Sequence, residues 1–330
     1  MLQLDNRTPF SASMATFPDE SGIDTLYVNV KARFQFKTNW VLCDEQLPPQ
    51  QFDEYLAEPG QSSITLASDF HTGKAATDII MLGAACAKDG KAVRGLDVTL
   101  EVGKRRKAVR VFGDRQWHQG EITPPQAFHS MPLVYERAYG GQHVEEGRVI
   151  SAEVRNPVGL GYLGERNESV LDGTALPNLE DPQQLIRSPK DTPAPTCFAF
   201  VAPNWHPRTN YAGTYDDTWR LQRAPFLPED FNKRFLNCAH QDLIYPGFIQ
   251  GGESVSISNM HPQGEIHCQL PTVSLACRVD VNNEAKQIAF NMETLTIEPN
   301  QKLFSMSWKA AYRCDKKLTK IKQATVYLNR

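Results

Sequence analysis

Three carboxylate residues stand among aromatic and arginine residues, the residue types that line sugar-binding sites. They are Glu136, Asp216 and Glu253. Glycoside hydrolysis needs one carboxyl group as acid and a second as base or nucleophile, held at a defined separation. Sequence spacing does not set that separation, and Arg137 beside Glu136 equally suits a structural ion pair. A carbohydrate-active hydrolase is therefore an alternative interpretation, and a structural role for Glu136 is favoured.

The histidines and cysteines do not form a metal or nucleophile pattern. His267 and Cys268 are adjacent, so on a strand they point to opposite faces and, with His261, make a poor zinc site. The segment 156–161 has glycines but lacks the Lys-Ser/Thr ending of a phosphate loop, and neither HExxH nor GxSxG occurs. We therefore expect no catalytic residue, no metal and no cofactor.

The run Gly113–Trp117 offers a different chemistry, that of partner binding. Arg115 and Trp117 belong to the residue types over-represented at interface hot spots. The alternative is a strand-ending turn in which Arg115 forms a buried ion pair with Asp69 or Asp78. Both interpretations remain open from the sequence.

Alternating side chains predict the strands that must position these residues. Even positions from Leu26 to Phe36 are apolar and odd positions mostly polar, which indicates a strand with one buried and one wet face. Residues 96–102 and 108–112 predict a hairpin, and residues 79–82 a strand buried on both faces. Further strands are expected at 266–270, 273–279, 288–292, 304–312 and 321–328, with a turn at 282–284.

Residues 121–250 are rich in Pro, Gly, Asn and aromatic residues and show little periodicity. Proline removes a ladder donor, so these stretches predict ordered loops packed on the sheets. Short helices are expected near 51–56 and 228–238, and a single helical turn would bring Tyr215 and Trp219 together. We predict one mainly β domain over residues 1–330, with sandwich- or barrel-like antiparallel sheets and a subdivision into 1–120, 121–250 and 251–330.

Composition narrows the class of protein. The chain has 330 residues, 41% of them hydrophobic and 22% charged, which is typical of a folded globular protein. A net charge of -3 argues against nucleic acid as a partner. The seven cysteines include no CxxC, the N-terminus has no signal-peptide pattern, and no run reaches the ~18 apolar residues of a spanning helix. These features predict a cytoplasmic protein without a membrane partner.

An ordered series of short motifs carries a family resemblance. In chain order they are Asp69, Lys74, Thr77-Asp78, Gly113-Asp114-Arg115-Gln116-Trp117, Tyr135-Glu136-Arg137-Ala138-Tyr139-Gly140-Gly141, Asn156-Pro157-Val158-Gly159-Leu160-Gly161, Leu176-Pro177-Asn178-Leu179-Glu180, Ala212-Gly213-Thr214-Tyr215-Asp216 with Trp219, Pro228-Glu229-Asp230-Phe231, Gly251-Gly252-Glu253 and Leu270-Pro271. Over residues 20–310 the series resembles a domain-of-unknown-function family encoded beside type VI secretion genes.

The resemblance implies an adaptor or chaperone that binds a toxic effector, often one with a PAAR-like N-terminal domain, and helps load it onto the VgrG spike. Binding would then depend on a few aromatic and arginine anchors in the loops, or on an edge strand that adds to the partner's sheet. The candidate anchors are Arg115, Trp117, Arg137, Trp205, Arg208 and Trp219. A structural part of the secretion apparatus is a third interpretation.

Overall fold

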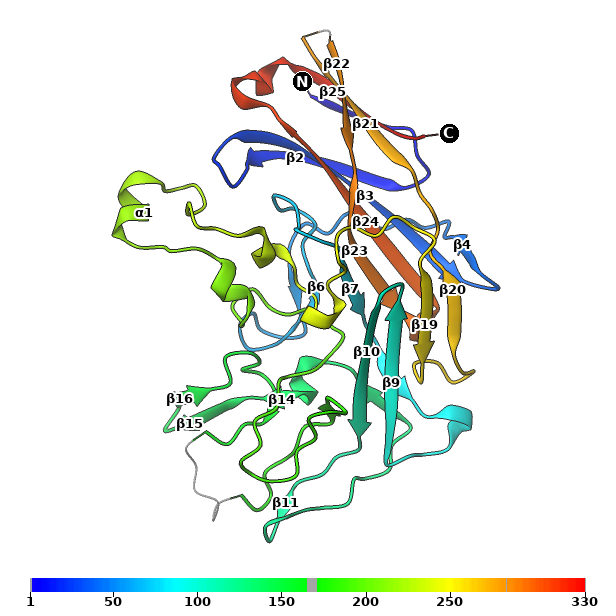
Figure 1. Cartoon of the computed structure of the whole chain (residues 1–330), viewed down its shortest axis with the longest axis vertical. Helices are drawn as coiled ribbons and strands as arrows, with labels where there is room; N and C mark the ends of the chain where they lie inside the picture. The colour runs from blue at the N-terminus through cyan, green and yellow to red at the C-terminus, as the bar shows by residue number, and fades with distance from the viewer. Residues whose placement is uncertain (1, 165–170, 283, 330) are drawn as a thin grey trace.

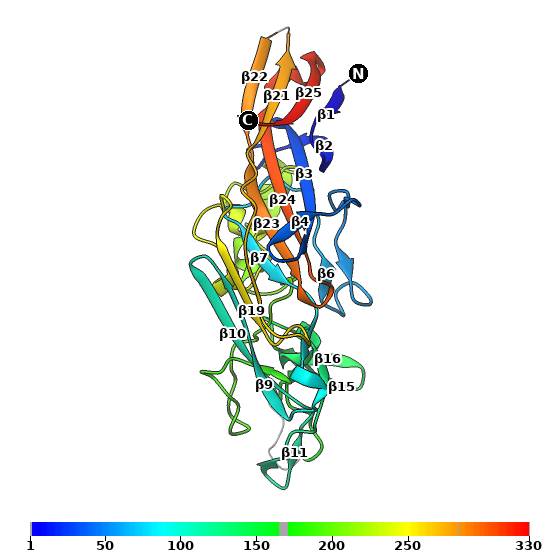
Figure 2. The ribbon, with the colours of Figure 1, turned by 90° about the vertical axis from the view of Figure 1, so that its right-hand side faces the viewer.

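The structure is a computed structural model that describes residues 2–164, 171–282 and 284–329. Strands hold 43% of the residues and helices 9%, which confirms the mainly β prediction. The large sheets stay open and do not close on themselves in the described part of the chain. Figures 1 and 2 show these sheets following one another along the long axis of the molecule.

The central sheet has six strands and combines both ends of the chain. Its order is β2-β3-β24-β23-β7, with β4 paired to β3, and only the β23–β7 pair is parallel. The strands are β2 (Ser11–Pro18), β3 (Asp24–Phe36), β4 (Trp40–Leu42), β7 (Asp78–Met81), β23 (Asn291–Glu298) and β24 (Leu303–Arg313). The predicted strand at 79–82 is confirmed, and all four residues of β7 are buried.

Two further sheets flank the central one. A four-stranded sheet has the order β1-β25-β21-β22, and a five-stranded sheet has the order β18-β10-β9-β19-β20. Their strands are β1 (Gln3–Asn6), β25 (Ile321–Leu328), β21 (Leu275–Val281), β22 (Glu284–Ala289), β18 (Leu179–Glu180), β10 (Arg105–Phe112), β9 (Gly95–Val102), β19 (Ser254–Ser258) and β20 (Ile266–Gln269). The predicted hairpin is the β9–β10 pair, with Val98 opposite Val109.

The remaining elements are short. Two-stranded pairs join β5 (Glu54–Tyr55) with β6 (Ile64–Leu66), β8 (Ala84–Cys86) with β13 (Ser130–Pro132), β11 (Trp117–His118) with β12 (Glu121–Ile122), β14 (Tyr139–Gly140) with β17 (Leu160–Gly161), and β15 (Gln142–Glu145) with β16 (Arg148–Ala152). The helix α1 spans Asp217–Gln222, and the 3₁₀ helices are η1 (Lys88–Gly90), η2 (Tyr135–Arg137), η4 (Arg208–Tyr211), η5 (Lys233–Leu236), η6 (Gln241–Leu243), η7 (Pro299–Gln301) and η8 (Asp315–Lys320).

Three local predictions differ from the structure. The helix predicted at 51–56 is wrong, because β5 pairs with β6 there. The helix predicted at 228–238 reduces to the 3₁₀ helix η5. Residues 288–292 are divided at Phe290 between β22 and β23, which belong to different sheets. Of the predicted turn at 282–284, Asn282 has a left-handed φ of 51° and Asn283 lies outside the described residues.

The strand β3 is buried more fully than its alternation predicts. The even positions are buried as expected, but Tyr27 and Asn29 on the other face are buried too. Phe17 stacks on Tyr27 at 4.3 Å between ring centroids, and Asn29 Oδ1 accepts a hydrogen bond from Lys309 Nζ at 2.8 Å. On this second face, the Phe17 side chain of the neighbouring strand β2 therefore covers Tyr27, and the contact with Lys309 satisfies the buried Asn29.

One hydrophobic core runs through all three large sheets. It includes Val28 of β3, Val98 of β9 and Cys277 of β21, together with Phe198 and Trp205 from the loop-rich middle. The loops from residue 121 onward are thus packed on the sheets, as their aromatic content predicts. No helix within the described ranges has the length and apolar character needed to cross a membrane.

Candidate functional site

Arg115 and Trp117 are both buried in the segment that follows β10, and Trp117 begins β11. The guanidinium of Arg115 binds the carboxylate of Glu180 and lies over the Phe112 ring at 3.7 Å. The predicted buried ion pair therefore exists, but its partner is Glu180 and not Asp69 or Asp78. Trp117 packs in a second core cluster with Tyr139.

Arg137 and Trp205 also stabilise the loops from within. Arg137 is half-buried, and its Nη1 donates to Asn178 Oδ1 at 2.9 Å. Trp205 is only 1% exposed and contacts the Tyr135 ring edge to face, with centroids 5.3 Å apart. Their contacts in this structure are internal, and partner contact for these residues stays a prediction.

The segment 156–161 joins neighbouring loops by contacts with their backbone. Asn156 is fully buried, and its Nδ2 donates to the carbonyl oxygens of Tyr135 and Tyr139 at 2.8 and 3.0 Å. A Cβ on Gly159 would lie 2.5 Å from the Ala138 carbonyl oxygen, so only glycine fits beside this strand. The glycines therefore serve close backbone packing.

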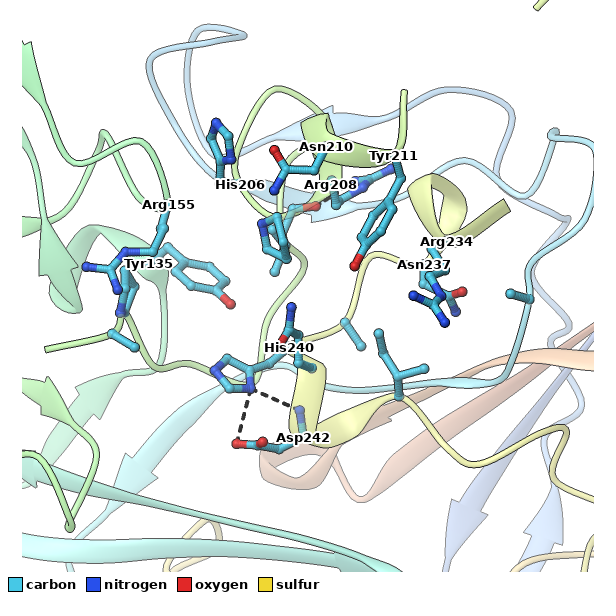
Figure 3. Close-up of a pocket in the computed structure, with 18 of the residues that line it drawn as sticks. Tyr135, Arg155, His206, Arg208, Asn210, Tyr211, Arg234, Asn237, His240 and Asp242 are labelled. Carbon is cyan, nitrogen blue, oxygen red and sulfur yellow. Dashed lines mark hydrogen bonds and ion pairs between the residues drawn. The ribbon is translucent and has the colours of Figure 1, made fainter. Parts of the chain in front are cut away.

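A cavity of about 970 Å³ lies among these loops (Figure 3). It is lined by Ala75, Ala76, Tyr135, Val154, Arg155, Ala194, Pro195, Val201, His206, Pro207, Arg208, Asn210, Tyr211, Arg234, Asn237, Ala239, His240, Gln241, Asp242 and Ile244. All but Ala75 and Ala76 come from residues 121–250, the loop-rich middle. A volume of this size is at the upper end of the ~300–1,000 Å³ typical of ligand pockets.

Of the six candidate anchors, Arg208 alone lines this cavity. It belongs to η4, and its Nε and Nη1 donate to the carbonyl oxygens of Phe235 and Val201 at 2.9 and 2.6 Å. The bond to Phe235 holds η4 against η5. No sequence pattern indicates the other polar lining residues, because they come from separate loops.

A buried ion pair fixes one wall of the cavity. Lys74 Nζ lies 2.7 Å from Asp78 Oδ2, and both side chains are excluded from solvent. Asp78 also accepts hydrogen bonds from Asn237 Nδ2 at 2.9 Å and from the Cys238 amide at 2.8 Å. Burial alone would lower the pKa of Lys74, but the adjacent Asp78 carboxylate outweighs it and raises that pKa. The charged pair therefore anchors the loop that carries Asn237 and His240 to β7.

His240 and Asp242 form the polar side of the cavity beside η6. His240 Nδ1 lies 3.3 Å from Asp242 Oδ2, and Lys107 Nζ lies 3.1 Å from the same oxygen (Figure 3 draws the first contact). Burial, with Lys107 nearby, lowers the pKa of His240 to about 4. The imidazole is therefore neutral near pH 7, and the Asp242 charge is matched by Lys107.

The three carboxylates considered for hydrolysis each serve a local structural bond. Glu136 accepts from the Ser63 amide and hydroxyl at 2.7 and 2.8 Å, Asp216 caps α1 through the Trp219 amide at 2.8 Å, and Glu253 accepts from the Gly251 amide at 2.9 Å. Figure 1 shows β14, α1 and β19, the elements beside these residues, in different parts of the molecule. The three do not share one site.

Trp219 lies on a projecting loop that we name the arm, residues 212–231 (Figure 1). As its spacing predicts, Trp219 meets Tyr215, with ring centroids 4.7 Å apart. Tyr215 is 54% exposed and Leu221 78% exposed. At its base, Arg223 Nη2 donates to the Glu20 carbonyl oxygen at 2.9 Å. The arm thus presents apolar side chains to solvent from an anchored loop.

His261, His267 and Cys268 do not meet as ligands, and no group of three or more His, Cys, Asp or Glu side chains in the described part of the chain is arranged to hold a metal ion.

A comparison with known protein families matches most of the chain. The sequence profile described as "Uncharacterized protein conserved in bacteria (DUF2169)" matches residues 21–309. No curated protein and no solved structure matches the chain.

Proposed function

This chain belongs to the DUF2169 family, and we propose that it is a non-catalytic adaptor that binds a type VI secretion effector through a PAAR-like region and helps load it onto the VgrG spike. The ordered motifs quoted from the sequence support this placement. The observation that carries the binding role is the cavity of about 970 Å³, whose lining combines apolar side chains with arginines.

The arm supplies a second surface for the same partner. Burial of an exposed leucine such as Leu221 contributes about 1.5–3 kcal/mol, and the Tyr215–Trp219 pair offers adjoining aromatic area. Exposed apolar groups gathered on a projecting loop are typical of a protein contact. A partner that covers the arm and enters the cavity would explain both features.

Co-expression with the proteins encoded by neighbouring genes, in particular any PAAR-like one, tests this function. We expect such a neighbour to co-purify with this chain, and we expect deletion of this gene to stop secretion of that effector. Leu221→Ser should weaken co-purification, whereas Leu56→Ser, at an exposed leucine outside the arm, should leave it unchanged. A chain that stays alone with every neighbour, or that turns over a small molecule, would refute the adaptor proposal.

A further inference from the structure

The cations of the cavity are only partly neutralised. Arg155 is paired with Glu153, through Nε–Oε1 and Nη2–Oε2 distances of 2.7 and 2.6 Å. Arg208 and Arg234 have no carboxylate within 4 Å among the residues that the structure describes, and Arg234 makes its one side-chain contact with the Tyr211 ring at 5.8 Å. Asp242, the one carboxylate of the lining, is already matched by Lys107. The cavity therefore carries an excess of positive charge.

The Tyr135 hydroxyl is a second polar feature of the cavity. The Tyr135 side chain is 2% exposed, and Figure 3 shows its oxygen pointing into the cavity. This hydroxyl has no hydrogen-bond partner within the described ranges of the chain. Because the hydroxyl faces the cavity and can both donate and accept, it is available to a polar group that enters.

The donors that remain available do not converge on one point. In Figure 3, Tyr135 lies on one side of the cavity and Arg234 on the other, and apolar residues such as Val201 and Ile244 also line it. A small anion is best bound where several donors meet. Spread donors along an apolar surface suit an extended chain that has carboxylates at intervals and apolar side chains between them.

We infer that the cavity holds an acidic segment of the partner polypeptide. Carboxylates of this segment bind Arg208 and Arg234, and another acceptor of the segment receives a hydrogen bond from the Tyr135 hydroxyl. Exposed lining residues, among them Val154, Asn210 and Gln241, leave the cavity open for such a segment to enter. This inference rests on the proposed function, because it names the chemistry by which the adaptor holds its partner.

The test uses the full chain and an array of short synthetic peptides of random sequence. We expect the bound peptides to be enriched in Asp and Glu next to apolar residues. The strongest binder and its counterpart with Asn and Gln in place of Asp and Glu then serve as fluorescent probes in anisotropy titrations. The acidic probe should bind about tenfold more tightly than the neutral probe, and added salt should reduce the difference.

Arg234→Gln supplies the matched variant, since Arg234 is exposed and its removal breaks no hydrogen bond to the fold. It should weaken binding of the acidic probe about tenfold and leave the neutral probe unchanged. Arg220→Gln, on α1 and paired only with Asp217, should change neither. No acidic enrichment on the array, or unchanged binding by Arg234→Gln, would overturn the inference.

The two proposals fail separately. If the PAAR-like neighbour co-purifies with the native chain and with Arg234→Gln equally, the acidic-segment inference is wrong and the adaptor function stands. If acidic peptides are selected but no neighbour co-purifies, the cavity specificity stands and the adaptor function is wrong.

Discussion

Removal of the Arg115 guanidinium should destabilise the fold. We expect this loss of stability, and not the loss of a contact with a partner, to be its main effect. The side chains of Arg115 and Glu180 are 6% and 0% exposed. In Arg115→Met, the Glu180 carboxylate keeps one hydrogen bond, from the Ile186 amide at 2.9 Å. Breaking a buried ion pair from one side costs about 3–5 kcal/mol, because the other charge is left in a poorly solvating environment. We expect a loss of about 4 kcal/mol in the free energy of unfolding.

The effect should depend on pH with a defined sign. Burial raises the pKa of Glu180 even though Arg115 opposes it. Without Arg115 that pKa rises further, so the folded variant binds a proton more readily than the unfolded chain. The free energy of unfolding of the variant therefore increases on acidification from neutral pH toward the ordinary glutamate range, and the deficit against the native chain shrinks.

Urea denaturation followed by tryptophan fluorescence and circular dichroism measures both effects. Arg115→Met/Glu180→Met should recover most of the loss, because an apolar pair often replaces a buried ion pair without cost. Arg278→Met removes an exposed pair with Asp280 and should cost about 0–1 kcal/mol. If Arg115→Met costs no more than this control, or if its deficit is independent of pH, the reasoning is wrong.

Two further stability predictions come from other buried groups. Burial lowers the pKa of Lys309 to about 8 from its ordinary 10.5, so between these pH values the unfolded chain binds more protons than the folded chain. The free energy of unfolding of the native chain should therefore increase relative to that of Lys309→Met as the pH rises through this range. A difference in urea midpoint between the two proteins that stays constant across the range would contradict this prediction. Trp205→Ala should cost about 3–5 kcal/mol in the same denaturation assay, because it removes a large side chain packed on Tyr135, and a loss near zero would show that the loops do not depend on it.

Alternation of apolar and polar residues correctly predicts those strands in which one face is buried and the other is more exposed. The hairpin of 96–102 with 108–112 follows this rule, since a period of two is encoded residue by residue. Leu26 to Phe36 also forms the predicted strand, although Tyr27 and Asn29 on its polar face are buried too. The order of strands is different. The parallel pairing of β7 with β23 joins segments from opposite ends of the chain, and nothing local specifies it.

The candidate site was predicted less well, for a related reason. Glu180 reaches Arg115 because β18 pairs with β10, which places Glu180 opposite Arg110. The spacing of residues in the sequence does not predict that register. Composition also does not determine the role of Trp205. An aromatic residue in an irregular segment can pack in the core of the loops or can contact a partner. The loop-rich middle supplies nearly all of the cavity lining, and its role in partner binding stays a prediction.

The pairing of β3 with β24, which lie far apart in the sequence, has a consequence during protein synthesis. Asn29 of β3 faces Lys309 of β24, 280 positions later in the chain. At ~5–20 residues per second, a ribosome takes about 15 to 55 seconds to cover that interval. Throughout that time β3 can form its hairpin with β2, but its other edge has no partner. The nascent chain thus exposes an apolar strand edge until β24 emerges, and such an edge is a template for aggregation unless a chaperone covers it.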